Sequence, residues 1–200
     1  MFPNMTQRLM NYWVYGGFLA AFLLLGLTPV FSGEWDLALL LVFLQLPCYM
    51  LHQLEEHDND RFRHFVNQIL GDGREILSKK AVFVINVPGV WGVNLLSILL
   101  AYEINIGFGL IGIYLTLINA FVHIAQAIHL RRYNPGLITA VFLFLPLGGL
   151  ALWEIILDGI PLSFHFLGAG TAVAIHLAII AYVGMNLMRM RSAQPPTKEI

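Results

Sequence analysis

The sequence predicts an all-α, polytopic membrane protein: a bundle of six transmembrane helices with one interfacial amphipathic helix and both termini in the cytoplasm. Three observations predict this fold. Hydrophobic residues make up 58% of the chain and charged residues only 12%, about half the charged fraction of a soluble domain. Several apolar runs approach or exceed the ~18 residues that indicate a transmembrane helix. Finally, all 11 Lys and Arg residues fall on one side of a six-span topology.

The first two predicted spans are separated by a short acidic turn at residues 32–36. The first runs from about Asn11 to Phe31, which is long for the apolar region of a signal peptide. The second begins at Leu37 and runs into the polar sequence 52–57, His-Gln-Leu-Glu-Glu-His. Ionisable residues within a membrane span are costly and are typical of a functional site.

Residues 58–80 form the only extended polar segment before the C-terminal tail. Its apolar residues recur at helical spacing: Phe62, Phe65, Val66 and Ile69. This pattern predicts an amphipathic helix that lies in the membrane interface and ends at the glycines of residues 71–73.

The four remaining spans each end at a polar turn or at basic residues. They are predicted at about Ala81–Ala101, Gly107–Arg132, Leu137–Leu157 and Phe164–Met188. We therefore expect residues 1–190 to form a single transmembrane domain, followed by a polar tail at 191–200.

The placement of charge predicts the orientation of the chain. In the six-span topology the charged residues of the opposite loops are all acidic, namely Glu34, Asp36, Glu103 and Asp158. The positive-inside rule then places both termini and the end of the second span in the cytoplasm. Because the basic residues are scattered in ones, twos and threes, the sequence shows no nucleic-acid-binding patch. We expect a multi-pass protein of a bacterial inner (plasma) membrane, with membrane lipids as partners and the oligomeric state left open.

One face of the second span is polar. Residues at intervals of three and four form a helical stripe: Gln45, Cys48, His52 and Glu55. Glu56 lies one turn after His52 and flanks the same face. His57 is rotated about 140° from His52, and we expect it, with Asp58, to be a solvated helix end. Cys48, the only cysteine, is expected to be a small buried hydrophobic residue.

The fourth span carries a second polar stripe, and the depths of the two stripes match. Its members are Asn119, His123, Gln126 and Tyr133, with His129 on an adjacent face. His52 lies six residues before the end of its span and His123 eight residues before Arg131, so about 9 Å and 12 Å deep. His176 lies 13 residues before Arg189, about 20 Å deep, and is predicted to be too far away.

Imidazole and carboxylate ligands together suit zinc, or iron when more carboxylates share the site. His52 with Glu55 or Glu56 would supply two ligands and His123 a third, with His129 as a further candidate. The second glutamate would be the general base. Three further side chains could orient ligands or stabilise developing charge, namely Asn119, Gln126 and Tyr133.

These residues resemble the HXXEE family of uncharacterised membrane proteins. The sequence His52-x-x-Glu55-Glu56 matches the motif that names the family, and residues 133–136, Tyr-Asn-Pro-Gly, match its Tyr-x-Pro-Gly motif. The family also carries a further histidine, for which His123 is the better match and His129 the alternative. The resemblance covers most of the chain and implies a metal-binding membrane hydrolase without specifying a substrate.

Taken together, the sequence predicts a membrane-embedded, metal-dependent hydrolase that acts on an ester or amide of a lipid-like or other hydrophobic small molecule near the cytoplasmic leaflet. One alternative is a di-iron membrane oxygenase or desaturase that also uses His57 and His129; the lack of repeated histidine boxes argues against it. Another is a non-enzymatic transporter or membrane scaffold, although paired broken helices in matching halves are not evident.

Overall fold

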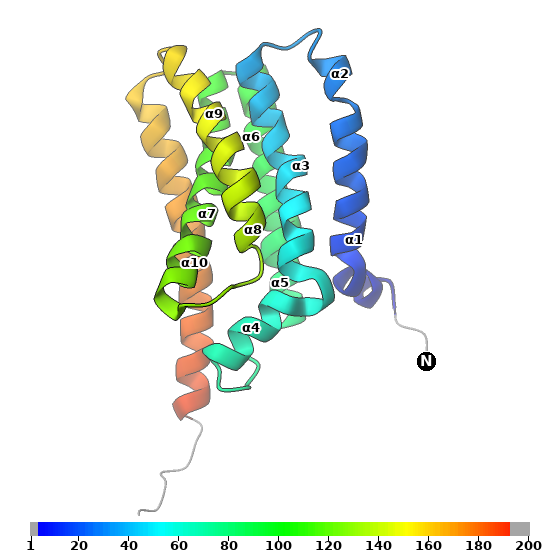
Figure 1. Ribbon diagram of the computed structural model, residues 1–200, viewed down its shortest axis with the longest axis vertical. Helices are drawn as coiled ribbons and strands as arrows, with labels where there is room; N and C mark the ends of the chain where they lie inside the picture. The colour runs from blue at the N-terminus through cyan, green and yellow to red at the C-terminus, as the bar shows by residue number, and fades with distance from the viewer. Residues whose placement is uncertain (1–3, 193–200) are drawn as a thin grey trace, which may run out of the picture.

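The computed structural model describes residues 4–192. Within that range the chain forms ten α-helices joined by short 3₁₀ and π-helical segments, and it contains no β-strand. Six helical stretches of residues 4–192 are long and apolar enough to cross a membrane: Met5–Phe31, Leu37–Ile69, Lys79–Glu103, Ile106–Leu130, Leu137–Leu157 and Leu162–Ser192. The all-α, six-span prediction is therefore confirmed, and Figure 1 shows the helices standing side by side in a bundle.

The first two spans begin with capped helices. The side chain of Asn4 accepts a hydrogen bond from the N–H of Gln7 at the start of α1 (Met5–Gly26), and the short α2 (Thr28–Phe31) follows. Asp36 accepts one from the N–H of Leu39 at the start of α3 (Leu37–His57). Such caps satisfy N–H groups that the helix leaves unpaired. Helix α1 packs along α3, which lies near the middle of the bundle (Figure 1).

The polar segment after α3 folds back beneath the bundle. Asn59 and Asp60 adopt left-handed conformations (φ 53° and 59°) and turn the chain into α4 (Arg61–Ile69). Val66 of α4 is buried in a cluster that includes Trp13 and Ile76. The predicted amphipathic helix therefore exists over a shorter range than 58–80, and its apolar side packs on the protein itself (Figure 1).

Two of the remaining spans contain π-helical turns. The third consists of α5 (Lys79–Val84), a π-helical segment (Ile85–Trp91) and α6 (Gly92–Glu103). The fifth consists of α8 (Leu137–Thr139), a π-helical segment (Ala140–Phe144) and α9 (Leu145–Leu157). Such turns are rare and occur often at functional sites.

The fourth and sixth spans complete the bundle. A 3₁₀ turn (Ile106–Gly109) leads into α7 (Leu110–Leu130), and α10 (Leu162–Ser192) is the longest helix of the described chain. Helices α7 and α10 pack closely against each other. Because α10 has 31 residues, it extends beyond the ~20 residues needed to cross a bilayer.

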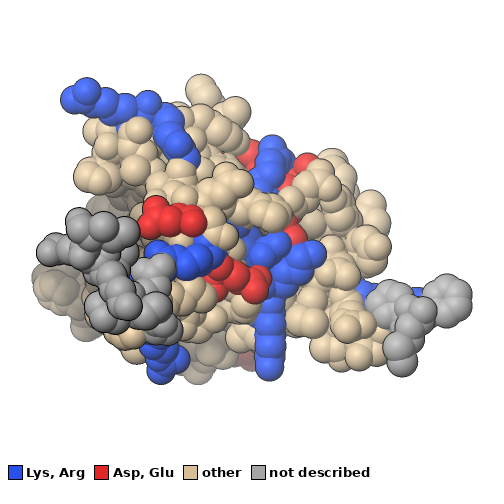
Figure 2. Space-filling view, turned by 90° about the horizontal axis from the view of Figure 1, so that it is seen from below, with Lys and Arg blue, Asp and Glu red and all other residues tan. Residues whose placement is uncertain are grey.

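The Lys and Arg residues of the described chain gather at one end of the bundle. This is the lower end in Figure 1, where α1 begins, α4 lies, and α7 and α10 end. Figure 2 shows this end from below, with several Asp and Glu side chains between the basic ones. Four of the arginine and lysine residues pair with neighbouring carboxylates: Arg61, Arg63, Arg74 and Lys79.

Candidate metal centre

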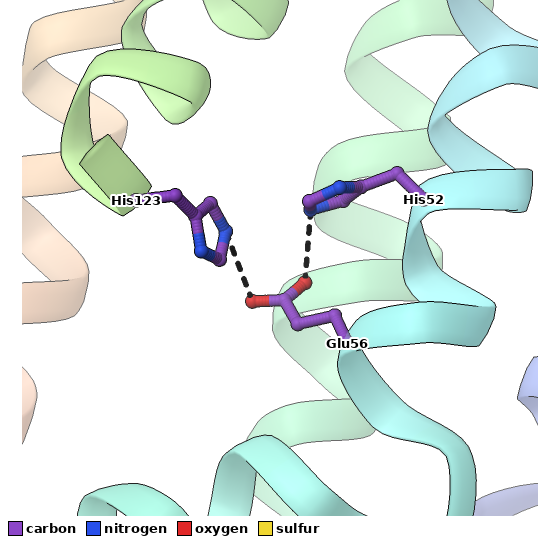
Figure 3. A group of neighbouring side chains, drawn as sticks. All are labelled: His52, Glu56 and His123. Atoms are coloured by element: carbon purple, nitrogen blue, oxygen red, sulfur yellow. Dashed lines mark ion pairs between the residues drawn. The ribbon is translucent and has the colours of Figure 1, made fainter. Parts of the chain in front are cut away.

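Three side chains that are distant in sequence meet inside the bundle (Figure 3). His52 and Glu56 come from the last turns of α3, and His123 comes from α7. The exposed fractions of these residues are 0%, 6% and 3%. The Glu56 carboxylate lies between the two imidazoles: Oε2 is 3.5 Å from His52 Nε2, and Oε1 is 3.6 Å from His123 Nε2. We call these three residues the metal cluster.

The orientation of the His123 ring is fixed by the turn that follows α7. Arg131 adopts a left-handed conformation at the end of the helix, and the chain then returns so that Asn134 is fully buried. The Asn134 amide N–H donates to the His123 carbonyl (2.9 Å), which leaves its Oδ1 facing His123 Nδ1 at 2.7 Å. Since Oδ1 can only accept, Nδ1 carries the ring proton and Nε2 presents a lone pair to the cluster.

The His52 ring is fixed in the same way from α8. Thr139 Oγ1 donates to Glu55 Oε2 at 2.5 Å and lies 2.8 Å from His52 Nδ1. The only proton of the hydroxyl is directed at the carboxylate, so its oxygen accepts from His52 Nδ1–H. His52 Nε2 then presents a lone pair to the cluster, and it has no hydrogen-bond partner among the described residues.

The cluster therefore gathers acceptors without a donor between them. Two imidazole lone pairs and a carboxylate lie within 4.8 Å of one another, which is a group that could hold a metal ion. The two distances from Glu56 run to different oxygens, so the carboxylate bridges the space between the two Nε2 atoms. The ligand types match a zinc site, because neutral imidazole and carboxylate are common zinc ligands. Histidine ligands whose other ring nitrogen is hydrogen-bonded are typical of metal centres.

Glu55, which was predicted as a ligand or base, is turned away from the cluster. Its Oε1 accepts from the Tyr133 hydroxyl (2.8 Å) and from Ile138 N–H (3.1 Å), and its Oε2 also accepts from Thr139 N–H (2.7 Å). The carboxylate thus caps the N-terminus of α8, where backbone N–H groups are unpaired and negative charge is favoured. Glu55 is a positioning residue for Thr139.

Tyr133, which was predicted as a catalytic residue, contacts Glu55 and is 47% exposed. Partial burial and the hydrogen bond to the negatively charged Glu55 carboxylate raise the pKa of Tyr133 to about 12. The phenol therefore stays protonated at neutral pH and donates to Glu55. This arrangement links Tyr133 to His52 through Glu55 and Thr139.

His57 was expected to be solvated, and the structure corrects that expectation. Its exposed fraction is 6%, and its Nε2 lies 3.1 Å from Glu56 Oε2. The ring is covered by Trp13 of α1 and Phe62 of α4, with ring centroids 5.2 Å and 5.7 Å away. His57, the last residue of α3, is therefore buried because α4 and α1 pack over that end of the helix.

Two other sequence candidates lie outside the cluster. His129, the alternative family histidine, is exposed near the end of α7 and is not part of the group of possible ligands. Cys48 is buried and free, as expected. Both residues lie outside the set of side chains that converge on Glu56.

A largely apolar cavity of about 310 Å³ adjoins the cluster. Glu56, His57 and His123 form part of its wall, together with Tyr49 of α3 and with residues of α4, α5, α7, α10 and the π-helical segment 85–91. Both Gln126 and His176 line it. His176, which was predicted to be too far from the two histidines, is not part of the group of possible metal ligands.

The fold and the site define a six-span, membrane-type helical protein with a buried His/Glu cluster that could bind a metal ion. The chain belongs to the HXXEE family, because the family model described as "Protein of unknown function with HXXEE motif" matches residues 43–151. This range contains the whole metal cluster together with Glu55, Asn134 and Thr139. Comparisons with curated proteins and with solved structures gave no match.

Proposed function

We propose that this protein is a membrane-embedded, metal-dependent hydrolase that acts on a lipid-like or other hydrophobic substrate. The observation that supports this best is the contact between the apolar cavity and the metal cluster, since Glu56 and His123 belong to both. A hydrophobic molecule in the cavity would have its reacting group beside them. Pockets that combine apolar walls with a few convergent polar groups are typical of substrate sites.

Three exposed side chains among the cavity-lining residues support entry from the bilayer. Leu70, Val122 and Ile180 line the cavity and are also 44%, 39% and 60% exposed. They connect the cavity wall to the outer apolar surface of the bundle. A lipid-like substrate would then reach the site without leaving the membrane.

In this proposal His52 and His123 hold a divalent cation, zinc being the ion that suits the ligands best, with Glu56 beside it. The cation would polarise a carbonyl and lower the pKa of water to about 7. Glu56 accepts the proton of the attacking water and returns it to the leaving oxygen or nitrogen of the ester or amide. Glu55 and Thr139 hold His52, and Asn134 holds His123, so both rings keep the lone pair of Nε2 directed at the site.

The decisive experiment measures the metal content and hydrolytic activity of the purified protein with a 4-nitrophenyl ester of a long-chain fatty acid. We expect about one zinc per chain, loss of hydrolysis on chelation and recovery with zinc. His123→Ala should lose the metal, whereas the matched control His129→Ala should keep metal and activity. A wild-type protein without metal would rule out the proposal. A metal content that His52→Ala leaves unchanged would also rule it out, because the metal would then be bound elsewhere.

The same measurement separates the hydrolase from the di-iron alternative. Two irons per chain would favour an oxygenase. Within the described residues, however, the group of possible ligands contains one carboxylate, and di-iron sites in helical bundles use several. The arrangement therefore favours the hydrolase.

The roles of the two glutamates can be tested by conservative variants. Glu56→Gln should abolish hydrolysis while the two imidazoles retain part of the metal affinity. Glu55→Gln should keep measurable hydrolysis, because this carboxylate acts only through Thr139. If Glu55→Gln were inactive with full metal content and Glu56→Gln were active, the assignment of the base would be reversed.

A further inference from the structure

A second polar layer lines the same cavity one helical turn above the metal cluster. Tyr49 lies three residues before His52 on α3, and Asn119 lies four residues before His123 on α7. The ring centroids of Tyr49 and His52 are 5.9 Å apart. At a rise of 1.5 Å per residue, the two side chains lie about 4.5–6 Å further along their helices than the cluster.

Two polar atoms of this layer, the Tyr49 hydroxyl and Asn119 Oδ1, are buried with hydrogen-bonding capacity left over. Tyr49 is 1% exposed, and the neighbouring Asn119 side chain is the polar group nearest its hydroxyl, which has no other partner within the described chain. Asn119 Oδ1 is also buried without a partner among the described residues. Buried polar groups are costly when unsatisfied, so two such groups on one cavity wall indicate a ligand that supplies their partners.

His176 adds a third group from α10. Its Nδ1 lies 2.8 Å from the Ala172 carbonyl, which can only accept, so Nδ1 carries the proton. The Nε2 atom is therefore an acceptor, and the residue lines the cavity. The layer thus offers two acceptors, on Asn119 and His176, together with the Tyr49 hydroxyl, which can donate or accept.

We propose that Tyr49, Asn119 and His176 form a recognition layer for a hydroxyl or amide N–H group of the ligand, because the two acceptors require a donor. The substrate would then be a lipid-like ester or amide that carries a hydrogen-bond donor about 4.5–6 Å from its reacting group. A partial glyceride meets this description and a plain fatty ester does not. The position of the reacting group rests on the proposed function, whereas donor recognition does not.

The walls around this layer restrict the remainder of the ligand to apolar groups. Val90, Leu115 and Ile175 line the cavity beside the three polar side chains. Outside the cavity, Phe144 is fully buried and packs on both Tyr49 and His52, with centroid distances of 4.7 Å and 4.3 Å, which holds the Tyr49 ring in place. The ligand is therefore expected to carry one hydrogen-bond donor at this layer and to be otherwise apolar.

The test uses the full chain in phosphatidylcholine nanodiscs with two photoreactive probes, a diazirine-bearing dodecanol and its methyl ether. Labelling of cavity residues is quantified by mass spectrometry. We expect the alcohol to label about fivefold more than the ether, the preference that one hydrogen bond provides. Tyr49→Phe and Asn119→Leu should reduce this ratio towards one. Tyr114→Phe is the matched control, since its hydroxyl contacts His165 outside the cavity.

Equal labelling by the two probes would overturn the inference, because water would then hydrogen-bond to Tyr49, Asn119 and His176 as well as the alcohol does. An unchanged ratio in both cavity variants would also overturn it. His52→Ala removes a metal-cluster residue and should keep the ratio; loss of the ratio there would assign donor recognition to the cluster instead. A retained ratio in a protein without hydrolytic activity would refute only the proposed function.

Discussion

At the scale of single residues, the site depends on side chains that never face the cavity. Thr139 lies between Glu55 and His52 and determines which nitrogen of His52 carries its proton. Asn134 does the same for His123. Each imidazole thus keeps its proton on Nδ1 and its Nε2 lone pair free for a cation because of one neutral side chain. These two side chains, Asn134 and Thr139, lie on either side of Pro135-Gly136 in the sequence.

Replacement of Thr139 by valine should weaken metal binding without removing a ligand. The variant keeps the shape of the side chain but leaves His52 Nδ1 without its acceptor, and loss of such partners lowers metal affinity about 10–100-fold. Chelator competition on the purified protein measures this change. Thr139→Ser should retain near-normal affinity.

The matched control for that experiment is Thr116→Val on α7. Thr116 is fully buried, and its hydroxyl has no partner within the described chain. We expect the Thr116→Val protein to bind metal with the affinity of the wild-type protein. Equal losses in the two valine variants would show that Thr139 acts through general stability instead of through His52.

The contact between Tyr133 and Glu55 predicts a pH dependence. The pKa of Tyr133 is raised to about 12, above the value near 10 of an unfolded chain. Its protonated form is favoured in the folded state, so the stabilising contact is complete below pH 10 and is lost as pH rises through about 12. Glu55→Gln should move the pKa of Tyr133 back towards 10.

Ultraviolet absorbance titration measures this shift as a difference between paired proteins. The signal of Tyr133 is the wild-type curve minus that of Tyr133→Phe, and the same subtraction is made in the Glu55→Gln background. An unchanged midpoint in that background would mean that burial alone raises the pKa of Tyr133.

At the scale of helices and turns, the decisive element is the turn between α7 and α8. Gly136 adopts φ 98° and lies against both imidazoles, so a Cβ there would be 2.7 Å from His123 Cε1 and 2.8 Å from His52 Cε1. The glycine of the Tyr-x-Pro-Gly motif is therefore required by its conformation and by the space it leaves to the two rings.

Gly136→Ala should destroy the cluster. The left-handed backbone would be strained by about 1–3 kcal/mol, and both rings would have to move. We expect loss of bound metal and a lower melting temperature. Gly149→Ala on α9 is the control, because a Cβ at Gly149 meets no atom within 4 Å; if both variants kept the metal, close packing at Gly136 would not be required.

The sequence predicted the helices and the pair of histidines because both depend on periodicity and depth. The positions of His52 and His123 relative to the ends of their spans were sufficient to place both at a similar depth in the membrane. The sequence did not predict Thr139 or Asn134, since a hydroxyl and an amide in a turn give no periodic signal. It also missed His57, because its burial comes from α4 and α1, which fold against the end of α3. The Tyr-x-Pro-Gly resemblance was the one signal that pointed to the Asn134 turn.

At the scale of the whole molecule, basic side chains cover one end of an apolar bundle, where acidic side chains lie between them (Figure 2). The basic residues lie where α1 begins and α10 ends, and the opposite loops are acidic. We propose that the basic end faces the cytoplasm of a bacterial cell. The metal cluster would then lie nearer to the cytoplasmic face of the membrane.

Single-cysteine labelling in intact bacteria tests this orientation in a Cys48→Ala background. We expect Asp158→Cys, in the loop between α9 and α10, to react with a membrane-impermeant maleimide, because Asp158 is exposed. Arg132→Cys, after α7, should react only once the cells are permeabilised. The reverse pattern would place the cluster nearer to the outer face.

The Glu55 cap on α8 also constrains how the protein is made. His52 and Glu56 are synthesised with the second span, but Thr139 follows the fourth, so His52 lacks its orienting partner until the fifth span has emerged from the translocon. Metal acquisition is therefore expected to be a late step of biogenesis. Nascent chains truncated after residue 130 should insert without retaining metal, whereas chains extended beyond α9 should retain it.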